Sequence, residues 1–221
     1  MTKLFTRRAL LAVTSAALTV PALGQILPRD AATPLEVRRP EGEFAKRLHG
    51  LTMPTGKGWR AVMDKERLVQ VFVPDRWKQV ADPDGDSILK FVPPGQEKRA
   101  EAVFMVILTR PRDTDPLDVD EEFGSSYAEA LAQQEEFKKL KFEVTDSGFV
   151  LARGMRFALA GGKMSPPRRK PIRQQQLIYI AEDRIVTLQF SAAEAEYEKY
   201  VADVARMFAS YMTIGSRKEA P

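Results

Sequence analysis

The chain has 221 residues, carries 34 Lys and Arg against 30 Asp and Glu, and contains one histidine and no cysteine. The lack of cysteine excludes disulfide bonds, thiolate metal sites and a cysteine nucleophile, and a single histidine excludes metal sites built from several histidines. The length suits one domain with a substantial hydrophobic core.

The first 24 residues have the three parts of an export signal. Arg7 and Arg8 end a basic start, the uncharged segment 9–20 follows, and Ala22 and Gly24 place small residues where a signal peptidase reads the chain. The uncharged segment is too short for a stable membrane span, which needs about 20 residues, so an uncleaved anchor is disfavoured. We therefore expect cleavage and a periplasmic or secreted protein, or one in the thylakoid lumen if the organism is photosynthetic.

The export route has two alternatives. Residues 6–11 read Thr-Arg-Arg-Ala-Leu-Leu, which resembles the twin-arginine motif, and the mild segment behind them, rich in Ala, Thr and Ser, is typical of that route. Leu10 stands where Phe is commoner, and an ordinary secretory signal is the alternative. Twin-arginine export carries folded proteins, but it does not by itself imply a cofactor, and we expect none.

Cleavage would change the charge balance of the protein. The signal contains three basic residues and no acidic one, so its loss leaves 31 basic against 30 acidic residues and a net charge of +1. The basic character of the whole chain is therefore largely that of the signal, and general nucleic-acid binding loses its main support. We expect no nucleic-acid partner and no transmembrane segment in the mature chain.

Residues 25–57 mix four prolines with charged residues and show no long periodic segment. This composition predicts a mostly extended linker, in which GEFAKRLHG has the composition of a short helical turn. We expect the ordered domain over residues 58–213 and a disordered tail over residues 214–221.

The first part of the domain has the pattern of β-strands. WRAVM and LVQVFV flank the polar stretch DKER and predict a hairpin, which Pro74 ends because it has no donor for a strand ladder. SILKFV predicts the next strand. AVFMVIL, residues 102–108, is apolar on both faces, which predicts a central strand covered on both sides.

Two segments have a helical period. Residues 117–139 place Phe123, Tyr127, Ala130 and Leu131 on one face, with acidic residues at the start and lysines at the end. Residues 193–212 form the second segment, with one apolar stripe made of Tyr197, Val201, Val204, Phe208 and Tyr211.

Between these segments the chain again has strand character. KFEVTDSGFVLARGMRFALAG predicts a strand, a turn at residues 146–148 and a second long strand, and QQQLIYI and RIVTLQFSA predict a hairpin around AEDR. Strands joined by short turns form an antiparallel sheet whose apolar faces need covers. The element order therefore predicts an α+β fold, an antiparallel β-sheet sandwiched by two main helices.

Several of these segments together resemble a known family. VQVFVPDRW, SILKFVPPGQEKRAEAVFMVIL, the mid-chain helix, and QQQLIYIAEDRIVTLQFSAAEAEYEKY with the closing helix are similar in order to PsbP-like domains, a family that includes PsbP-related bacterial exported proteins. The resemblance covers residues 59–212. It implies an α-β-α sandwich and a role in binding or assembly without catalysis; no residue here indicates photosynthesis.

The best metal candidate in the sequence is the stretch Asp82-Pro83-Asp84-Gly85-Asp86. Three carboxylates within five residues offer the hard oxygen ligands that Ca²⁺ or Mn²⁺ prefers. The glycine comes too early for an EF-hand loop and no glutamate follows at the required place. A polar turn, in which Asp, Pro and Gly are ordinary, is the favoured interpretation of Asp82, Asp84 and Asp86.

Two other motifs are weaker. His49 lies in the predicted linker, and no nucleophile motif accompanies it, so a solvated histidine is favoured over a catalytic one and no catalytic residue is expected. The stretch TGKG, residues 55–58, resembles part of a phosphate-binding loop, but it lacks the spacing and the hydroxyl residue after the lysine. A flexible turn before the first strand explains it better.

The strongest functional signal is the stretch GGKMSPPRRKPIR, residues 161–173. Its prolines exclude a helix, so it predicts a protruding basic loop between two strands, without acidic residues. Guanidinium groups bind carboxylates and phosphates in pairs of hydrogen bonds, which suits an acidic protein face or an anionic component of the cell envelope. A solvated loop is the alternative. The candidate binding residues are Lys163, Arg168, Arg169, Lys170 and Arg173.

Three functional hypotheses follow from the sequence. The first is an exported, non-catalytic binding or assembly protein that presents a sheet face or the basic loop to a protein or anionic partner. The second is a hydrolase that uses paired carboxylates or a metal, because the pairing of acidic residues in space is not visible in a sequence. The third is a small-ligand binder with a cavity between sheet and helix.

Overall fold

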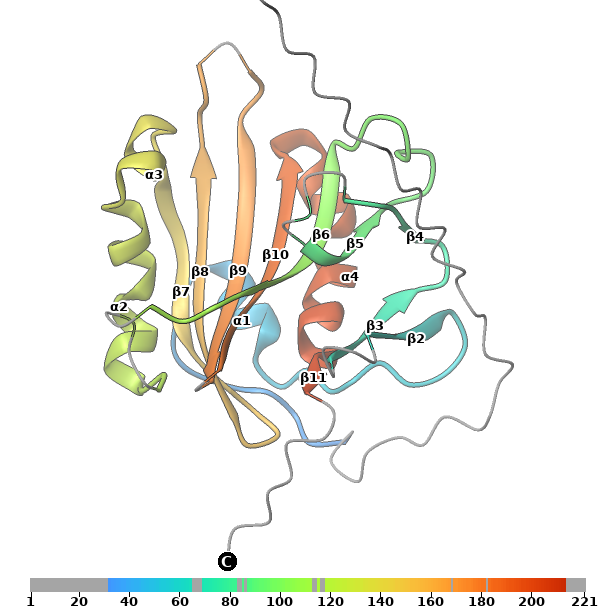
Figure 1. Cartoon of the computed structure of the whole chain (residues 1–221), viewed down its shortest axis with the longest axis horizontal. Helices are drawn as coiled ribbons and strands as arrows, with labels where there is room; N and C mark the ends of the chain where they lie inside the picture. The colour runs from blue at the N-terminus through green and yellow to red at the C-terminus, as the bar shows by residue number, and fades with distance from the viewer. Residues whose placement is uncertain are drawn as a thin grey trace, which may run out of the picture.

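The computed structural model describes residues 32–64, 69–82, 85, 87–112, 115, 118–167, 169–181 and 183–213 (Figure 1). The predicted signal and tail lie outside the described residues. Five candidate site residues also lie outside them: Arg7, Arg8, Asp84, Asp86 and Arg168.

The main element is an antiparallel sheet of eight strands. The strands are, in spatial order, β1 (Glu36–Glu41), β7 (Glu143–Ala152), β8 (Met155–Met164), β9 (Ile172–Ala181), β10 (Arg184–Ala193), β6 (Ala102–Thr109), β5 (Ser87–Val92) and β4 (Lys78–Gln79). Short turns join β7 to β8 and β9 to β10, whereas the longer loop 165–171 joins β8 to β9 (Figure 1). The predicted strands at residues 87–92, 102–108, 174–180 and 184–192 are confirmed.

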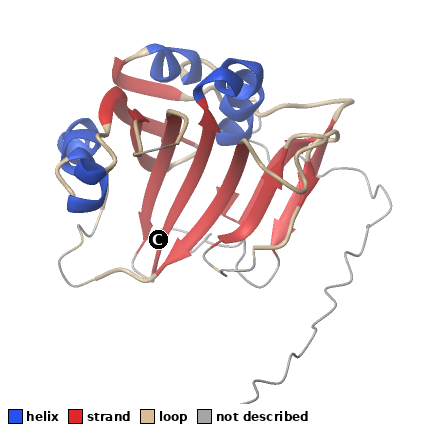
Figure 2. Ribbon diagram, turned by 90° about the horizontal axis from the view of Figure 1, so that it is seen from above, coloured by secondary structure: helices blue, strands red, loops and turns tan. Residues whose placement is uncertain are grey.

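Helices lie on both sides of this sheet (Figures 1 and 2). The long helix α4 (Glu194–Ser210) and the short helix α1 (Glu43–Leu48) pack on one face. Helix α2 (Glu121–Ala132), followed by α3 (Glu135–Lys139), packs on the other face over β7 and β8. The predicted α+β sandwich is therefore confirmed.

The predicted hairpin of residues 59–74 is confirmed, but it does not join the main sheet. Strands β2 (Trp59–Asp64) and β3 (Val69–Pro74) form a separate sheet with the short strand β11 (Met212–Thr213). The hydroxyl of Ser210, at the end of α4, accepts a hydrogen bond of 2.8 Å from the amide of Phe72. The small sheet is thereby attached to the end of the long helix.

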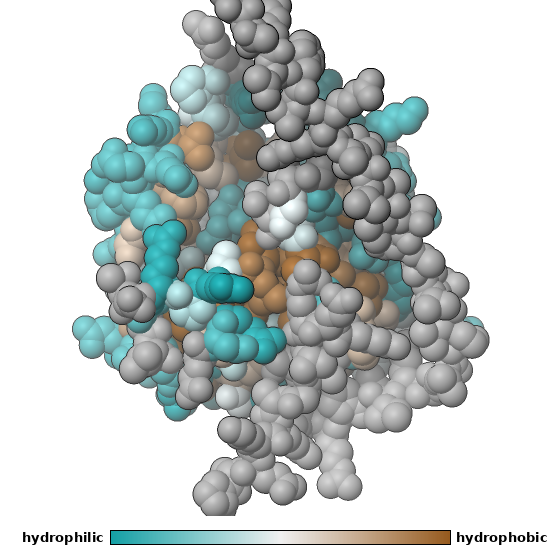
Figure 3. Space-filling model, in the orientation of Figure 1, coloured by the Kyte–Doolittle hydropathy of each residue, from teal (hydrophilic) through white to brown (hydrophobic). Residues whose placement is uncertain are grey.

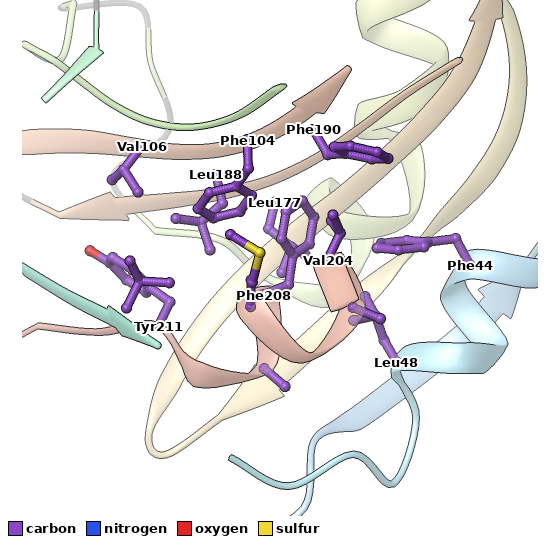
Figure 4. Close-up of a cluster of buried hydrophobic side chains, with 14 of the residues drawn as sticks. Phe44, Leu48, Phe104, Val106, Leu177, Leu188, Phe190, Val204, Phe208 and Tyr211 are labelled. Carbon is purple, nitrogen blue, oxygen red and sulfur yellow. The ribbon is translucent and has the colours of Figure 1, made fainter. Parts of the chain in front are cut away.

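The core lies between α4 and the main sheet (Figure 4). The predicted stripe is confirmed, because Tyr197, Val201, Val204 and Phe208 of α4 are all buried, and buried Tyr211 caps the helix. Phe208 lies at the centre, with its ring centroid 5.5 Å from that of Phe44 and 5.8 Å from that of Phe104. Aromatic side chains of this kind dominate the energetics of a core.

The prediction of an extended linker over residues 25–57 is wrong for residues 36–48, although the short helical turn expected within GEFAKRLHG is confirmed as α1. Residues 36–48 form β1, which pairs with β7 at the sheet edge, and α1, which carries buried Phe44 and Leu48. The apolar residues here are few and stand among prolines and charges, so no periodic pattern marks them. Packing against the distant strand β7 supplies the stability that the local sequence lacks.

The predicted turn at residues 146–148 is also wrong. These residues lie inside β7, and the chain turns instead at Arg153 and Gly154, where the glycine has a φ of +77°. Asp146 has a turn-forming side chain, but the fold uses that carboxylate elsewhere: its Oδ1 accepts hydrogen bonds from the amides of Phe44 (2.7 Å) and Ala45 (3.4 Å). It thus caps the first turn of α1.

The single helix predicted over residues 117–139 is two helices. Asp120 caps the start of α2 by accepting from the Phe123 amide at 2.7 Å, and α2 ends before Gln133. The buried side of α2 is Gly124, Ala128 and Leu131, whereas Ala130, predicted to be buried, is exposed. The reason is close packing, because a Cβ at Gly124 would lie 2.8 Å from the Phe149 ring.

Candidate functional site

Only residues 165–171 of the predicted basic loop connect β8 to β9, beyond the end of the sheet (Figure 1), because Lys163 lies in β8 and Arg173 in β9. Three of its cations are paired with acidic residues at its base. Lys163 lies 2.8 Å from Glu194, Lys170 lies 3.4 Å from Glu101, and Arg173 lies 3.3 Å from Glu198. The guanidinium of Arg173 also lies 4.1 Å from the centroid of the Tyr197 ring.

Because Lys163, Lys170 and Arg173 are paired with acidic residues, the unpaired positive charge that the structure describes in this loop is that of Arg169. Arg169 is exposed and its side chain forms no ion pair with a described residue, and Arg168 lies outside the described residues. A shallow pocket of about 340 Å³ at the base of the loop is lined by Lys170, Pro171 and the start of α4. That the loop binds a partner stays a prediction, and the cations at the base of the loop are already neutralised by Glu194, Glu101 and Glu198.

The Asp82 side chain forms hydrogen bonds within its own turn. Its Oδ2 accepts hydrogen bonds from the amide (2.8 Å) and hydroxyl (2.6 Å) of Ser87, and its Oδ1 lies 2.9 Å from the Lys90 ammonium. The Ser87 hydroxyl first, and then Lys90, lowers the pKa of Asp82 to about 2. Because Asp84 and Asp86 lie outside the described residues, the metal site stays a prediction; within those residues no group of three potential ligands is assembled.

His49 has a structural contact that the sequence did not reveal. It is exposed at the end of α1, and its Nδ1 accepts a hydrogen bond of 3.1 Å from the amide of Val37 in β1. The histidine therefore joins α1 to the edge strand. Among the described residues, Asp146 is the one buried acidic residue, and the paired carboxylates of the hydrolase hypothesis are not found there.

The structure reveals an open half of the main sheet. Helix α2 packs on β7 and β8, and no described helix packs on the same face of β9, β10, β6 and β5, where Val119 of the connection to α2 covers Ile180 and Ile185. The prediction that β6 is covered on both sides is therefore wrong. Phe104 and Val106 are fully buried under α4, whereas Val103, Met105 and Ile107 face the open side and are half-buried. Figure 3 shows hydrophobic residues at the centre of this face.

A chain of polar side chains runs beside this apolar row. The Tyr127 hydroxyl of α2 donates to Oε1 of Gln176 at 3.3 Å, and Nε2 of Gln176 donates to Gln189 at 3.0 Å. Gln189 donates to the hydroxyl of Ser191, which donates to Oε1 of Gln174, each at 3.3 Å. Burial raises the pKa of Tyr127 to about 12, so its hydroxyl stays protonated and donates.

We call this surface the open face: the apolar row Val103, Met105 and Ile107 of β6 together with the polar chain Gln174, Gln176, Gln189 and Ser191 of β9 and β10. The two rows are in register, because Met105 pairs with Gln189 and Gln189 with Gln176. At the end of the chain, Nε2 of Gln174 donates to no described residue. The apolar run of β6 was the one sequence signal that pointed here.

No protein-family model and no curated protein matches the chain. The fold is similar to cyanobacterial PsbP (CyanoP) from Synechocystis, with 13% sequence identity, 74% of this chain and 98% of that chain covered, and a TM-score of 0.52.

Two more distant solved structures are also similar. LpqN, involved in cell envelope biogenesis of Mycobacterium tuberculosis, is 15% identical over 71% of this chain and 91% of its own, with a TM-score of 0.47. The Saccharomyces cerevisiae Ran-binding protein Mog1p is 11% identical over 72% and 96%, with a TM-score of 0.44. Within the described residues, no helix combines the length and the apolar composition that crossing a bilayer requires. The domain of this chain has a PsbP-like fold.

Proposed function

We propose that this protein is an exported, non-catalytic binding or assembly protein that presents its open face to a protein partner. The single observation that carries the proposal is the open half of the sheet, where three apolar side chains of β6 lie half-buried without a helix above them. Soluble domains cover sheet faces of this composition, either with their own helices or with a partner.

The composition of the open face suits a protein partner. An apolar row supplies contact area, and amide side chains supply hydrogen bonds that adapt to either a donor or an acceptor. Because Tyr127, Gln176, Gln189 and Ser191 already bond to one another, the polar row stays satisfied when the partner is absent. Gln174 is only 7% exposed, but its Nε2 donates to no described residue and can bond to the partner at the end of the row.

The basic loop has a secondary role in this proposal. Strand β9 begins at Ile172, directly after the loop, so the Gln174 end of the open face lies beside it. The exposed cation Arg169, together with Arg168, would then attract an acidic edge of the partner and raise the rate of association more than the affinity. Export by the predicted signal would place this encounter outside the cytoplasm.

The experiment is photo-cross-linking in the source organism. A photoreactive residue replaces Thr187, which lies in β10 in register with Ile107 and Ile178, and a second protein carries it at Ala130, on the exposed side of α2. We expect a discrete cross-linked product from position 187 and none from position 130. Equal products from both positions would exclude the open face as the docking surface.

A matched pair of variants sharpens this test. Met105→Lys places a cation in the apolar row, and its long aliphatic stem can still lie along the sheet. Ala130→Lys makes the same change in charge on α2. We expect the product to be lost with Met105→Lys alone, with unchanged thermal stability in both. Loss with Arg168, Arg169 and Lys170 replaced by Glu, but not with Met105→Lys, would place the partner on the loop instead.

A further inference from the structure

A second surface, distant from the open face, forms a small pocket. It has a volume of about 360 Å³ and lies between the segment 50–59 and α4. Its lining includes Met53, Lys57 and Trp59 from the segment and Arg206 from the helix. A volume of this size is at the lower end of the range for small-molecule sites.

The charged residues that line this pocket are both cations. Lys57 and Arg206 are both exposed, no acidic residue is part of the lining, and neither cation forms an ion pair with a described residue. The acidic residue nearest to Arg206 along the helix, Asp203, is already engaged by Arg76 and by Nε1 of Trp77. Two cations that share a pocket without a counter-ion attract an anion.

An aromatic side chain forms the apolar part of the pocket. Trp59 is half-buried and packs against Met53 and Phe72, both of which are buried. The contacts with Met53 and Phe72 therefore fix the indole, and part of the indole lines the pocket. A flat group can stack on such a ring, and the stacking adds to the burial of apolar surface.

The segment that carries these groups is anchored at both ends. At its start, the amide of Gly50 donates to the carbonyl of Leu35 at 2.9 Å, and the amide of Leu35 donates to the carbonyl of Leu51 at 2.8 Å. At its end, the amide of Asp75 donates to the carbonyl of Gly58 at 2.9 Å. Anchored ends reduce the entropy that a ligand must remove on binding.

We propose that this pocket binds a small organic anion, a phosphate ester or a carboxylate attached to a flat ring. Arg206 takes the anionic group through paired hydrogen bonds, Lys57 adds a point charge, and Trp59 stacks on the ring. The site is independent of the open face, because Arg206 projects from α4 on the opposite side of the main sheet from α2.

Tryptophan fluorescence of the full chain tests the proposal. The chain has two tryptophans, and Trp77 is fully buried, so a ligand in the pocket changes the emission of Trp59. Phenyl phosphate and benzoate serve as probes, with inorganic phosphate and benzyl alcohol as comparison compounds that carry the anion or the ring alone. We expect saturable quenching by at least one ring-bearing anion, weaker binding of phosphate and no saturation with benzyl alcohol.

Variants assign the binding to the pocket. Arg206→Gln and Lys57→Gln should each raise the dissociation constant of the probe about tenfold, which corresponds to the loss of one charge-assisted hydrogen bond. Lys139→Gln, on exposed α3, removes the same charge far from the pocket and should leave it unchanged. Trp59→Phe should abolish the fluorescence response, with the fold checked by thermal unfolding.

Two results would overturn the proposal. One is the absence of saturation by either ring-bearing anion below about 10 mM, a concentration at which the binding free energy is only about 3 kcal/mol. The other is an equal effect of Lys139→Gln and Arg206→Gln, which would show general attraction to the charged surface. Cross-linking from the open face is unaffected by both outcomes, so this proposal and the proposed function fail separately.

Discussion

Replacement of Asp146 by alanine tests how the N-terminal elements are attached to the sheet. The Asp146 side chain is 1% exposed and accepts from the amides of Phe44 and Ala45. It also accepts from the hydroxyl of Thr145 at 2.8 Å and from Nε2 of Gln175 at 2.9 Å. The substitution removes the cap of α1 and leaves a buried amide of Gln175 with one partner fewer.

The magnitude follows from these contacts. Loss of a helix cap costs about 1–2 kcal/mol, and leaving a buried donor unsatisfied costs about 1–3 kcal/mol. Removing the buried charge itself recovers part of this cost. We therefore expect Asp146→Ala to lower the free energy of unfolding by about 3 kcal/mol, whereas Asp120→Ala, at the exposed cap of α2, should lower it by about 1 kcal/mol.

Urea denaturation followed by circular dichroism measures both values. With a slope of about 2 kcal/mol per M, the midpoint for Asp146→Ala should fall by about 1.5 M. In Asp146→Ala, amide hydrogen exchange should be faster in α1 than in β8, β9 and β10, because the carboxylate caps α1 and none of these strands. A loss below about 1 kcal/mol, or equal losses for the two variants, would refute the view that this carboxylate holds the N-terminal elements.

Three further predictions concern the turn, the α2 contact and the core. Asp82→Asn should lower stability by about 1–2 kcal/mol at pH 7; because the pKa of Asp82 is depressed to about 2, this difference should be present above pH 4 and vanish as the pH falls through 2 in acid titrations of unfolding. Gly124→Ala should lower the melting temperature although alanine favours helix, since its Cβ would lie 2.8 Å from the Phe149 ring; a higher melting temperature would contradict this packing. Phe208→Ala should cost about 3–5 kcal/mol in urea unfolding, and a cost near 1 kcal/mol would show that its site collapses.

The candidate sites were only partly visible in the sequence. The basic loop is conspicuous as a run of cations, yet its pairing with Glu101, Glu194 and Glu198 depends on elements before and after it in the chain. The open face depends on where α2 packs: the apolar run of β6 indicates two apolar faces, but not which one is left uncovered. The pocket depends on Arg206 meeting the segment that contains TGKG, a contact across most of the domain.

The local pattern of residues was sufficient for much of the fold. Alternation and helical period identified the hairpin of β2 and β3, the strands β5, β6, β9 and β10, and the stripe of α4, because these signals depend only on neighbours along the chain. The order of these elements was sufficient to predict an antiparallel sheet between helices.

Tertiary contacts decided the remaining features. Residues 36–48 form β1 and α1 only because β7 offers an edge and Asp146, 102 residues from Phe44, caps the helix. The same carboxylate would have favoured a turn in an isolated peptide, but in the fold it is buried against α1, and β7 continues through residues 146–148 with a register shift between Val144 and Asp146. A side chain with several competing local and distant partners takes the set that leaves the fewest buried polar groups unsatisfied, and only the folded chain shows which set that is.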